Sequence, residues 1–209
     1  MTQPRRALVL VDIQNEYFDG PLEIQHPPRN EALAAVIDAL TIAGEHNVPV
    51  AAIRHELPEG APVFAAGSTG AQLHPEVAEL VQSDWQQTSK VFASVFADTD
   101  LEEWIRAQEV DTITLVGFMT NNCIIGSAVG AESLGLKVEV LSDATGAIGI
   151  SNAAGSVDAK TLHTALLAVL HSNLAAVTDT AGWRQAVEDK TPVPASNLVE
   201  SALAGRTQN

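Results

Sequence analysis

Short, mostly apolar runs alternate along the chain with longer segments in which apolar residues recur at helical spacing. The runs that predict β-strands span residues 7–11, 48–53, 88–91, 112–116, 137–141 and 175–177. The segments that predict helices include Leu33, Val36, Ile37 and Leu40, at i, i+3, i+4 and i+7, and residues 74–82, 100–108, 124–134 and 159–171. Strands that alternate with helices imply right-handed crossovers, so the pattern predicts an α/β fold with a parallel sheet.

The character of the chain changes after residue 183. We expect one α/β domain over residues 1–183 and a C-terminal tail over residues 184–209. Within the tail, the proline-containing stretch 191–196 is typical of a linker, residues 196–204 predict a short amphipathic helix, and 205–209 a frayed end.

The composition excludes some classes of function. The chain has 209 residues, 46% of them hydrophobic, and a formal net charge of -15. That charge would repel a phosphate backbone, so we expect no nucleic-acid partner, and it favours neutral or cationic ligands only weakly. One cysteine excludes an internal disulfide framework.

The N-terminus is basic, but the apolar run behind it is short and is interrupted by Asp12. It therefore lacks the apolar length and cleavage site of a signal peptide. No apolar stretch approaches the about 18 residues that a membrane-spanning helix needs. These features predict a cytoplasmic protein without a membrane partner.

The single cysteine, Cys123, follows a predicted strand that ends at Gly117 and stands on the first turn of a predicted helix. Side-chain oxygens that could cap this helix precede it at Thr120, Asn121 and Asn122. A helix N-terminus favours an anion, so it would lower the pKa of the thiol and could hold an oxyanion. The alternative is an unreactive buried cysteine.

Two charged residues are expected at the same edge of the sheet as Cys123. Asp12 ends the first strand and Lys90 lies near the end of the third. Carboxyl ends of parallel strands form ligand sites, and a thiol nucleophile needs a base and a nearby cation. Taken singly, an aspartate after a strand is often a turn cap and a lysine is usually a surface charge. Their joint occurrence favours a catalytic triad of Asp12, Lys90 and Cys123.

With these motifs in order, the sequence resembles the isochorismatase-like cysteine hydrolases, which include nicotinamidases and N-carbamoylsarcosine amidases. The matching segments are residues 8–14 (LVLVDIQ), Lys90 with 94–96 (SVF), 117–124 (GFMTNNCI) and 140–144 (VLSDA). Their order and spacing agree from about residue 5 to residue 183.

The resemblance implies a three-layer α/β/α sandwich with a six-stranded parallel, Rossmann-like sheet. It also implies that Asp12 takes the thiol proton, that Cys123 attacks the carbonyl carbon to form a thioester, and that Lys90 keeps Asp12 ionised and helps lower the pKa of the thiol. The backbone N–H groups of Met119 and Cys123 would form the oxyanion hole. The family places a non-proline cis peptide where Phe118 precedes Met119.

The substrate pocket is expected in the loops 17–28, 55–73 and 146–158. Candidate pocket residues are Gln14, Tyr17, Phe18, His55 and Phe96. Gln14, Tyr17 and Phe18 could equally well pack the loop after Asp12.

We expect no metal and no cofactor. The nicotinamidase branch binds zinc through an aspartate and two histidines after the second strand, whereas residues 53–58 (IRHELP) offer one histidine and no Asp-x-His. A zinc site generally needs three or more protein ligands. This counts against a nicotinamidase. We interpret His163 and His171 as helix-surface residues rather than ligands.

The sequence therefore predicts an amidohydrolase that cleaves a small amide, lactam or carbamoyl group through a thioester and uses water. One alternative is an isochorismatase-type vinyl-ether hydrolase with Asp12 as general acid, which the retained Cys123 argues against. Another is a non-catalytic binding protein that keeps the fold. The resemblance also implies a homodimer or homotetramer.

Overall fold

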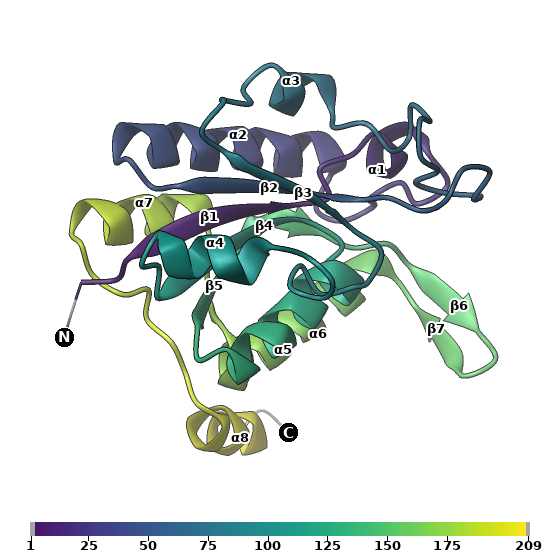
Figure 1. Cartoon of the computed structure of the whole chain (residues 1–209). Helices are drawn as coiled ribbons and strands as arrows, with labels where there is room; N and C mark the ends of the chain where they lie inside the picture. The colour runs from purple at the N-terminus through teal and green to yellow at the C-terminus, as the bar shows by residue number, and fades with distance from the viewer. Residues whose placement is uncertain (1–2, 208–209) are drawn as a thin grey trace.

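The computed structural model describes residues 3–207 and contains a six-stranded parallel sheet in the order β3-β2-β1-β4-β5-β8 (Figure 1). Its strands are β1 (Arg6–Val11), β2 (Val50–His55), β3 (Gln86–Lys90), β4 (Thr112–Phe118), β5 (Lys137–Gly146) and β8 (Ala176–Thr178). The predicted parallel sheet and α/β class are confirmed. The expected end of the fifth strand at Ser142 is wrong, because β5 continues to Gly146 through a register shift against β4.

Helices cover both faces of this sheet (Figure 1). One face carries α1 (Glu16–Asp19), α2 (Arg29–Glu45), α3 (Pro75–Ala78) and α7 (Thr180–Glu188). The other carries α4 (Leu101–Ala107), η1 (Thr120–Ile124), α5 (Ile125–Ser133), α6 (Ala159–Val169) and η2 (Leu170–Leu174). The architecture is the expected three-layer sandwich.

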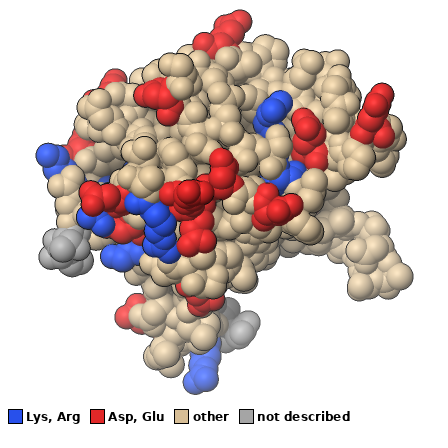
Figure 2. All heavy atoms as spheres, in the orientation of Figure 1, with Lys and Arg blue, Asp and Glu red and all other residues tan. Residues whose placement is uncertain are grey.

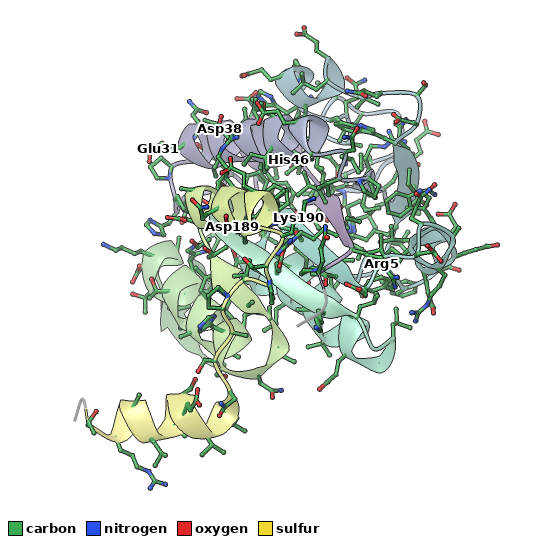
Figure 3. All side chains as sticks on the ribbon, turned by 90° about the vertical axis from the view of Figure 1, so that its left-hand side faces the viewer. Arg5, Glu31, Asp38, His46, Asp189 and Lys190 are labelled. Carbon is green, nitrogen blue, oxygen red and sulfur yellow. The ribbon has the colours of Figure 1, made fainter. Side chains whose placement is uncertain are left out.

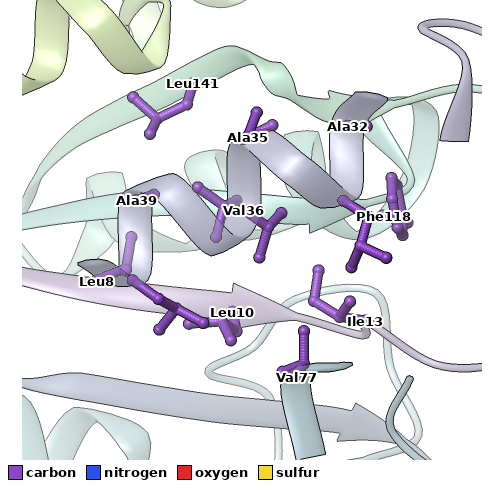
Figure 4. Close-up of a cluster of buried hydrophobic side chains, with 14 of the residues drawn as sticks. Leu8, Leu10, Ile13, Ala32, Ala35, Val36, Ala39, Val77, Phe118 and Leu141 are labelled. Carbon is purple, nitrogen blue, oxygen red and sulfur yellow. The ribbon is translucent and has the colours of Figure 1, made fainter. Parts of the chain in front are cut away.

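The alternation of side chains along β1 divides the core in two. Leu8 and Leu10 pack with α2, whereas Ala7, Val9 and Val11 pack with the helices on the opposite face. Figure 4 shows Val36 and Ala39 of α2 close to Leu8 and Leu10. Because both faces are covered, the strand is apolar at every position from Ala7 to Val11 rather than at alternate ones.

Several helix boundaries differ from the predictions. The helix expected over 74–82 is the short α3. The helix expected to carry Cys123 on its first turn begins as a wide-turn segment, η1, which runs into α5. Helix α4 begins where predicted, but Asp100 does not cap it and accepts a hydrogen bond from Gln86 instead. A hairpin of β6 (Ile150–Asn152) and β7 (Gly155–Val157), like α1 and α7, was not predicted.

The C-terminal region consists of a buried part and an exposed part. Helix α7 runs across residue 183, and Trp183 in it is fully buried. Beyond the linker, α8 (Leu198–Arg206) lies at the bottom of the view in Figure 3, contacts η2 and has no buried residue. The division into a domain over 1–183 and a tail stays a prediction, and the frayed end expected at 205–209 lies partly outside the described residues.

Charged groups lie mainly on the outside. Figure 2 shows acidic side chains dispersed over the visible face, with the fewer basic side chains among them. Glu31 and Asp38 lie on α2, which covers the face of the sheet opposite α5 (Figure 3). Within residues 3–207, no helix combines the length and the apolar character that crossing a membrane requires.

Candidate active site

The three residues of the predicted triad meet at the carboxyl ends of the strands. Asp12 directly follows β1, Lys90 is the last residue of β3, and Cys123 lies in η1 just after β4. Strand β2 lies between β1 and β3, so Lys90 reaches across the end of β2, where its register partner is His55. All three side chains are almost completely removed from solvent, at 0%, 2% and 1% exposed area.

The Lys90 ammonium is the centre of the site. Its Nζ lies 2.7 Å from Asp12 Oδ2, 3.2 Å from Cys123 Sγ and 3.1 Å from His55 Nδ1. An ammonium has three donors and no acceptor, so these contacts use all of them. His55 Nδ1 must therefore accept, which makes His55 a neutral imidazole with its proton on Nε2. Burial, followed by the Lys90 charge, lowers the pKa of His55, in agreement with this tautomer.

The environment of Cys123 stabilises the thiol rather than the thiolate. Burial and the Asp12 carboxylate raise the pKa of Cys123 to about 12, although the Lys90 charge opposes them. The expectation of a lowered pKa is therefore wrong. The helix terminus and the lysine are present, but removal of water and a carboxylate at close range outweigh them. The sulfur can react as a nucleophile only if a neighbour takes its proton.

Asp12 is placed to take that proton. One of its oxygens, one His55 ring nitrogen and the Cys123 sulfur lie within 4.8 Å of one another. Its Oδ2 is engaged by Lys90, whereas its buried Oδ1 has no nitrogen or oxygen partner among the described residues. Burial raises the pKa of Asp12 above its ordinary value, and the Lys90 charge partly offsets this. The result is a paired carboxylate with one free acceptor oxygen beside a thiol.

The backbone around Cys123 is held by close packing of β4 on β1. Gly117 has a φ of 111°, and a Cβ there would lie 2.1 Å from the Val11 carbonyl oxygen, so only glycine fits. The expected cis peptide between Phe118 and Met119 is present. Inside the helix, Ser127 Oγ donates to the Cys123 carbonyl at 2.6 Å and accepts from the Val95 N–H at 3.1 Å. The N–H groups of Met119 and Cys123 thus lie at the rigid start of η1.

The predicted capping of this helix is wrong. No side chain caps η1. Thr120 instead contacts the Gly146 carbonyl oxygen at 3.1 Å and His163 Nδ1 at 2.9 Å, and within the described chain the buried Asn121 Oδ1 has no partner. His163 is 4% exposed, so its interpretation as a surface residue is also wrong. His171 is half-buried and accepts a hydrogen bond from the Val177 N–H.

Aromatic side chains lie next to the triad. Tyr17 packs against Phe64 and Phe118, with ring centroids 5.2 Å and 5.5 Å away. Phe64 also packs on His55 at 5.1 Å. The pKa of Tyr17 is raised well above its ordinary value, mainly by burial and then by the charge of Asp12. Tyr17 and His55 therefore stay candidates for the pocket.

The other three pocket candidates have structural contacts. Gln14 is fully buried and clamps the backbone, with hydrogen bonds to the N–H and carbonyl of His55 and to the Ala71 carbonyl. Phe18 packs on His74 and Phe118. Phe96 packs beside α5, where a Cβ at Gly130 would come within 3.3 Å of its ring. These contacts favour packing and positioning for Gln14, Phe18 and Phe96.

Comparison with known proteins shows which family the chain belongs to. The model of the isochorismatase domain matches residues 6–182. The chain belongs to the isochorismatase family. A Burkholderia xenovorans LB400 protein classed with the isochorismatases has a crystal structure that matches with 40% identity and a TM-score of 0.96, over 99% of each chain. The structure of a cysteine hydrolase from Pseudomonas syringae pv. phaseolicola 1448A matches with 25% identity and a TM-score of 0.82, over 91% of this chain and 95% of the other.

A curated relative acts on amides. The nicotinamidase/pyrazinamidase of Mycobacterium tuberculosis is 28% identical over 165 residues, which cover 68% of this chain and 87% of the relative. Family membership and the relatives together identify the chain as a hydrolase. They do not fix which bond it cleaves.

Zinc, which the resemblance associates with nicotinamidases, does not fit this isochorismatase-family site. Among residues 3–207, the one group of potential ligands is Asp12, His55 and Cys123. The Lys90 ammonium contacts all three of these side chains, so a divalent ion there would meet a fixed positive charge. The absence of a metal requirement stays a prediction that this geometry supports.

Phe64 and Glu16 lie near the site, but no pattern in the sequence singled them out as site residues. Phe64 has a φ of 50°, and its N–H donates to Glu16 Oε2 at 3.3 Å. A lone phenylalanine in a loop of Gly, Ala, Pro and Ser, and a carboxylate on a one-turn helix, carry no recognisable motif. The loop's length was the only indication that it has a function.

Proposed function

We propose that this hydrolase cleaves the C–N bond of a small amide, lactam or carbamoyl substrate through a thioester at Cys123. The observation that carries the proposal is the buried arrangement of Asp12, Lys90 and Cys123, with Lys90 Nζ 2.7 Å from the carboxylate and 3.2 Å from the sulfur. A buried ion pair beside a lone thiol has no advantage for packing. It is what base-assisted attack by sulfur requires.

In the first half-reaction, Asp12 Oδ1 takes the thiol proton as Sγ attacks the carbonyl carbon. The carbonyl π-electrons move to oxygen, and the N–H groups of Met119 and Cys123 stabilise the resulting oxyanion. The oxyanion then collapses, the C–N bond breaks, and Asp12 returns its proton to the leaving nitrogen. This leaves an acyl-thioester and a free amine or ammonia.

In the second half-reaction, water takes the place of the amine. Asp12 accepts a proton from water while the water oxygen attacks the thioester carbon. Collapse of the tetrahedral intermediate then breaks the C–S bond. The thiolate recovers the proton from Asp12, so the net reaction is amide plus water to acid plus amine. Lys90 stays protonated throughout and holds the Asp12 carboxylate and the sulfur at one point.

The comparisons support this proposal without deciding the substrate. The Pseudomonas syringae structure is of a cysteine hydrolase, and the Mycobacterium tuberculosis relative is an amidase by name. The aromatic rings of Tyr17, Phe64 and Phe118 suit a small, flat or apolar substrate. A homodimer or homotetramer and a cytoplasmic location remain predictions.

The proposal is tested by screening amides, lactams and carbamoyl compounds for release of ammonia or amine, and separate samples with hydroxylamine trap the acyl group as a hydroxamate. We expect a substrate-dependent mass increase on the peptide that contains Cys123 in rapidly quenched samples. The chain has one cysteine, so a labile acyl adduct has one possible thiol. Turnover that persists in Cys123→Ala at wild-type level would exclude the thioester.

A second candidate is vinyl-ether hydrolysis of the isochorismatase type, with Asp12 as general acid. The observation in its favour is the raised pKa of Asp12, because a raised pKa increases the fraction of the carboxyl group that holds the proton a general acid must donate. This reaction does not need the thiol. It predicts activity that survives Cys123→Ala and is lost in Asp12→Asn, whereas the amidase loses activity in both. A non-catalytic binding protein would show saturable binding and no turnover in the wild-type chain.

A further inference from the structure

His163 is a buried histidine that the triad chemistry does not use. It comes from α6, is 4% exposed, and has both ring nitrogens engaged. Its Nδ1 lies 2.9 Å from Thr120 Oγ1, and its Nε2 lies 3.1 Å from the carbonyl oxygen of Ser142. Thr120 directly follows Met119, one of the two oxyanion donors of the proposed function. The histidine therefore connects α6 and β5 to the turn that presents these donors.

The partners fix the direction of each hydrogen bond. A carbonyl oxygen only accepts, so Nε2 carries a proton and donates to Ser142. Burial lowers the pKa of His163 against the opposing effect of its hydrogen bond to Ser142, and the nearby His26, whose ring packs edge-on at 5.6 Å, also lowers it. The neutral ring accepts at Nδ1, so the Thr120 hydroxyl has two acceptors for its proton, His163 Nδ1 at 2.9 Å and the Gly146 carbonyl oxygen at 3.1 Å.

This bond adds a side-chain restraint to a turn in which few other side chains make hydrogen bonds. No side chain caps η1, and the first turn is held by the Met119 carbonyl, which accepts from the Asn122 N–H at 3.0 Å and the Ile124 N–H at 3.1 Å. The Thr120 side chain is the one polar side chain of the first three η1 residues that has a hydrogen-bond partner within residues 3–207. Thr120 lies between the peptide that carries the Met119 N–H and the peptide that carries the Cys123 N–H, so a restraint on Thr120 acts on the turn that joins the two donors.

We propose that His163 is a positioning residue for the oxyanion hole, which it orients through the Thr120 hydroxyl without touching the substrate. This inference rests on the proposed function, because it assigns a task within that same site. It predicts that His163 affects the stabilisation of a tetrahedral adduct and leaves the access and intrinsic reactivity of the sulfur unchanged.

Two probes separate these properties. Small aldehydes, from propanal to benzaldehyde, form a thiohemiacetal: the S–H bond breaks and Asp12 takes the proton, the C–S bond forms, and the carbonyl electron pair moves to the oxygen, which occupies the oxyanion hole. Iodoacetamide alkylates the same sulfur by displacing iodide and does not use the hole. We expect His163→Gln and Thr120→Val each to weaken aldehyde binding about tenfold while the iodoacetamide rate stays within about twofold of wild type.

Matched variants distinguish positioning from general packing. His163→Asn can place an amide near the Nδ1 position and keep the Thr120 partner, so it should retain more aldehyde affinity than His163→Gln. The double variant His163→Gln/Thr120→Val should lose no more than either single variant, because both remove one interaction. His171→Asn, which changes a half-buried histidine in η2 that bonds to Val177, should bind aldehydes like wild type.

The outcomes also separate this inference from the proposed function. Wild-type aldehyde affinity in both His163→Gln and Thr120→Val would overturn the positioning role and leave the proposed function standing. Equal losses with both probes would also overturn it, because they would indicate general disruption of the site. A wild-type chain that forms no adduct at Cys123 with any aldehyde would overturn the proposed function and the inference together.

Discussion

The sheet buries two ion pairs, one toward the amino ends of its strands and one at their carboxyl ends. The two pairs differ in how many hydrogen bonds the carboxylate accepts. Arg6 and Glu139 lie side by side at 2.8 Å, with each side chain 4% exposed, and Asp12 and Lys90 lie at 2.7 Å with 0% exposed. Glu139 accepts from Arg6, from the Thr114 hydroxyl and from the Trp183 indole N–H, so both of its oxygens are engaged. Asp12 accepts from Lys90 at Oδ2, and its Oδ1 has no nitrogen or oxygen partner among the described residues.

The difference distinguishes a structural carboxylate from a reactive one. A buried charge is costly, and proteins usually offset the cost by filling its hydrogen-bonding positions, as around Glu139. An oxygen left without a donor keeps its basicity and can accept a proton from a neighbour. Both pairs are equally buried and equally short, so burial and distance alone do not identify the reactive one. The reactive pair is identified by a carboxylate oxygen that has no hydrogen-bond donor, in a carboxylate close to a thiol.

The largest expected effect is on turnover. Asp12→Asn removes the base, so we expect kcat/KM for an amide substrate to fall about a thousandfold with the fold retained. Glu139→Gln makes the same chemical change in the other pair, and we expect kcat/KM to change less than about twofold. Steady-state kinetics of both variants, with circular dichroism as a check on folding, measure this. Similar losses in the two variants would mean that the pairs do not differ in the way argued here.

The second effect is on stability and concerns the buried Arg6–Glu139 pair. Glu139→Gln leaves the buried Arg6 without its counter-charge, so we expect the free energy of unfolding to fall by about 3 kcal/mol. Urea denaturation measures the change. The control is Glu102→Gln, which breaks an exposed pair with Arg106 at 3.4 Å and should cost less than about 0.5 kcal/mol. Equal losses in Glu139→Gln and Glu102→Gln would contradict a structural role for the buried pair.

The third effect concerns Lys90 and pH. The Lys90 charge lowers the pKa of Asp12 against the larger effect of burial. Asp12 must be ionised to act as base, so activity falls as the pH drops through its pKa. Lys90→Met removes the cation, the pKa of Asp12 rises further, and the acid limb of the kcat/KM profile moves to higher pH. We expect about a hundredfold loss at neutral pH, and an unmoved limb would exclude this role for Lys90.

The sequence was sufficient for the elements that a local pattern specifies. Apolar runs predict the parallel strands, and motifs in order predict the triad at their carboxyl ends. The family resemblance implies the cis peptide before Met119. The structure contains these strands and that peptide and brings the triad residues together. The isochorismatase-like resemblance is likewise confirmed. These features depend on residues close in sequence or on a chain order that many relatives share.

Features set by long-range packing were not predictable in the same way. His163 was interpreted as a helix-surface residue, and the approach of Thr120 and Ser142 from other elements makes it a core residue. The pKa of the thiol was predicted in the wrong direction for the same reason. Motifs place a helix terminus and a lysine near Cys123, but the amount of water removed depends on the loops that close over it. Sequence periodicity contains no measure of that closure.

The smallest effect is on the alkylation rate of Cys123. It is the most specific one, because the same substitution should raise this rate and lower amide turnover. Burial and the Asp12 charge raise the pKa of Cys123 to about 12, while Lys90 lowers it. Asp12→Asn removes the anion, so the thiolate fraction near pH 7 should rise and iodoacetamide should alkylate Cys123 about tenfold faster than in wild type. Lys90→Met should slow alkylation. The chain has one cysteine, so the mass of the intact protein reports the rate without interference.

A variant that is nearly inactive on amides yet more easily alkylated would separate the two tasks of Asp12. Toward a simple alkylating agent, the carboxylate only disfavours a second negative charge beside it. Toward an amide, it must also hold the proton and give it to the leaving nitrogen, a step that iodide does not need. Glu139→Gln, at the other pair, should alkylate at the wild-type rate. If Cys123 in Asp12→Asn were alkylated more slowly than in wild type, Asp12 would already activate the sulfur before substrate binds. Its Oδ1 would then not be an acceptor that takes the thiol proton only during the reaction.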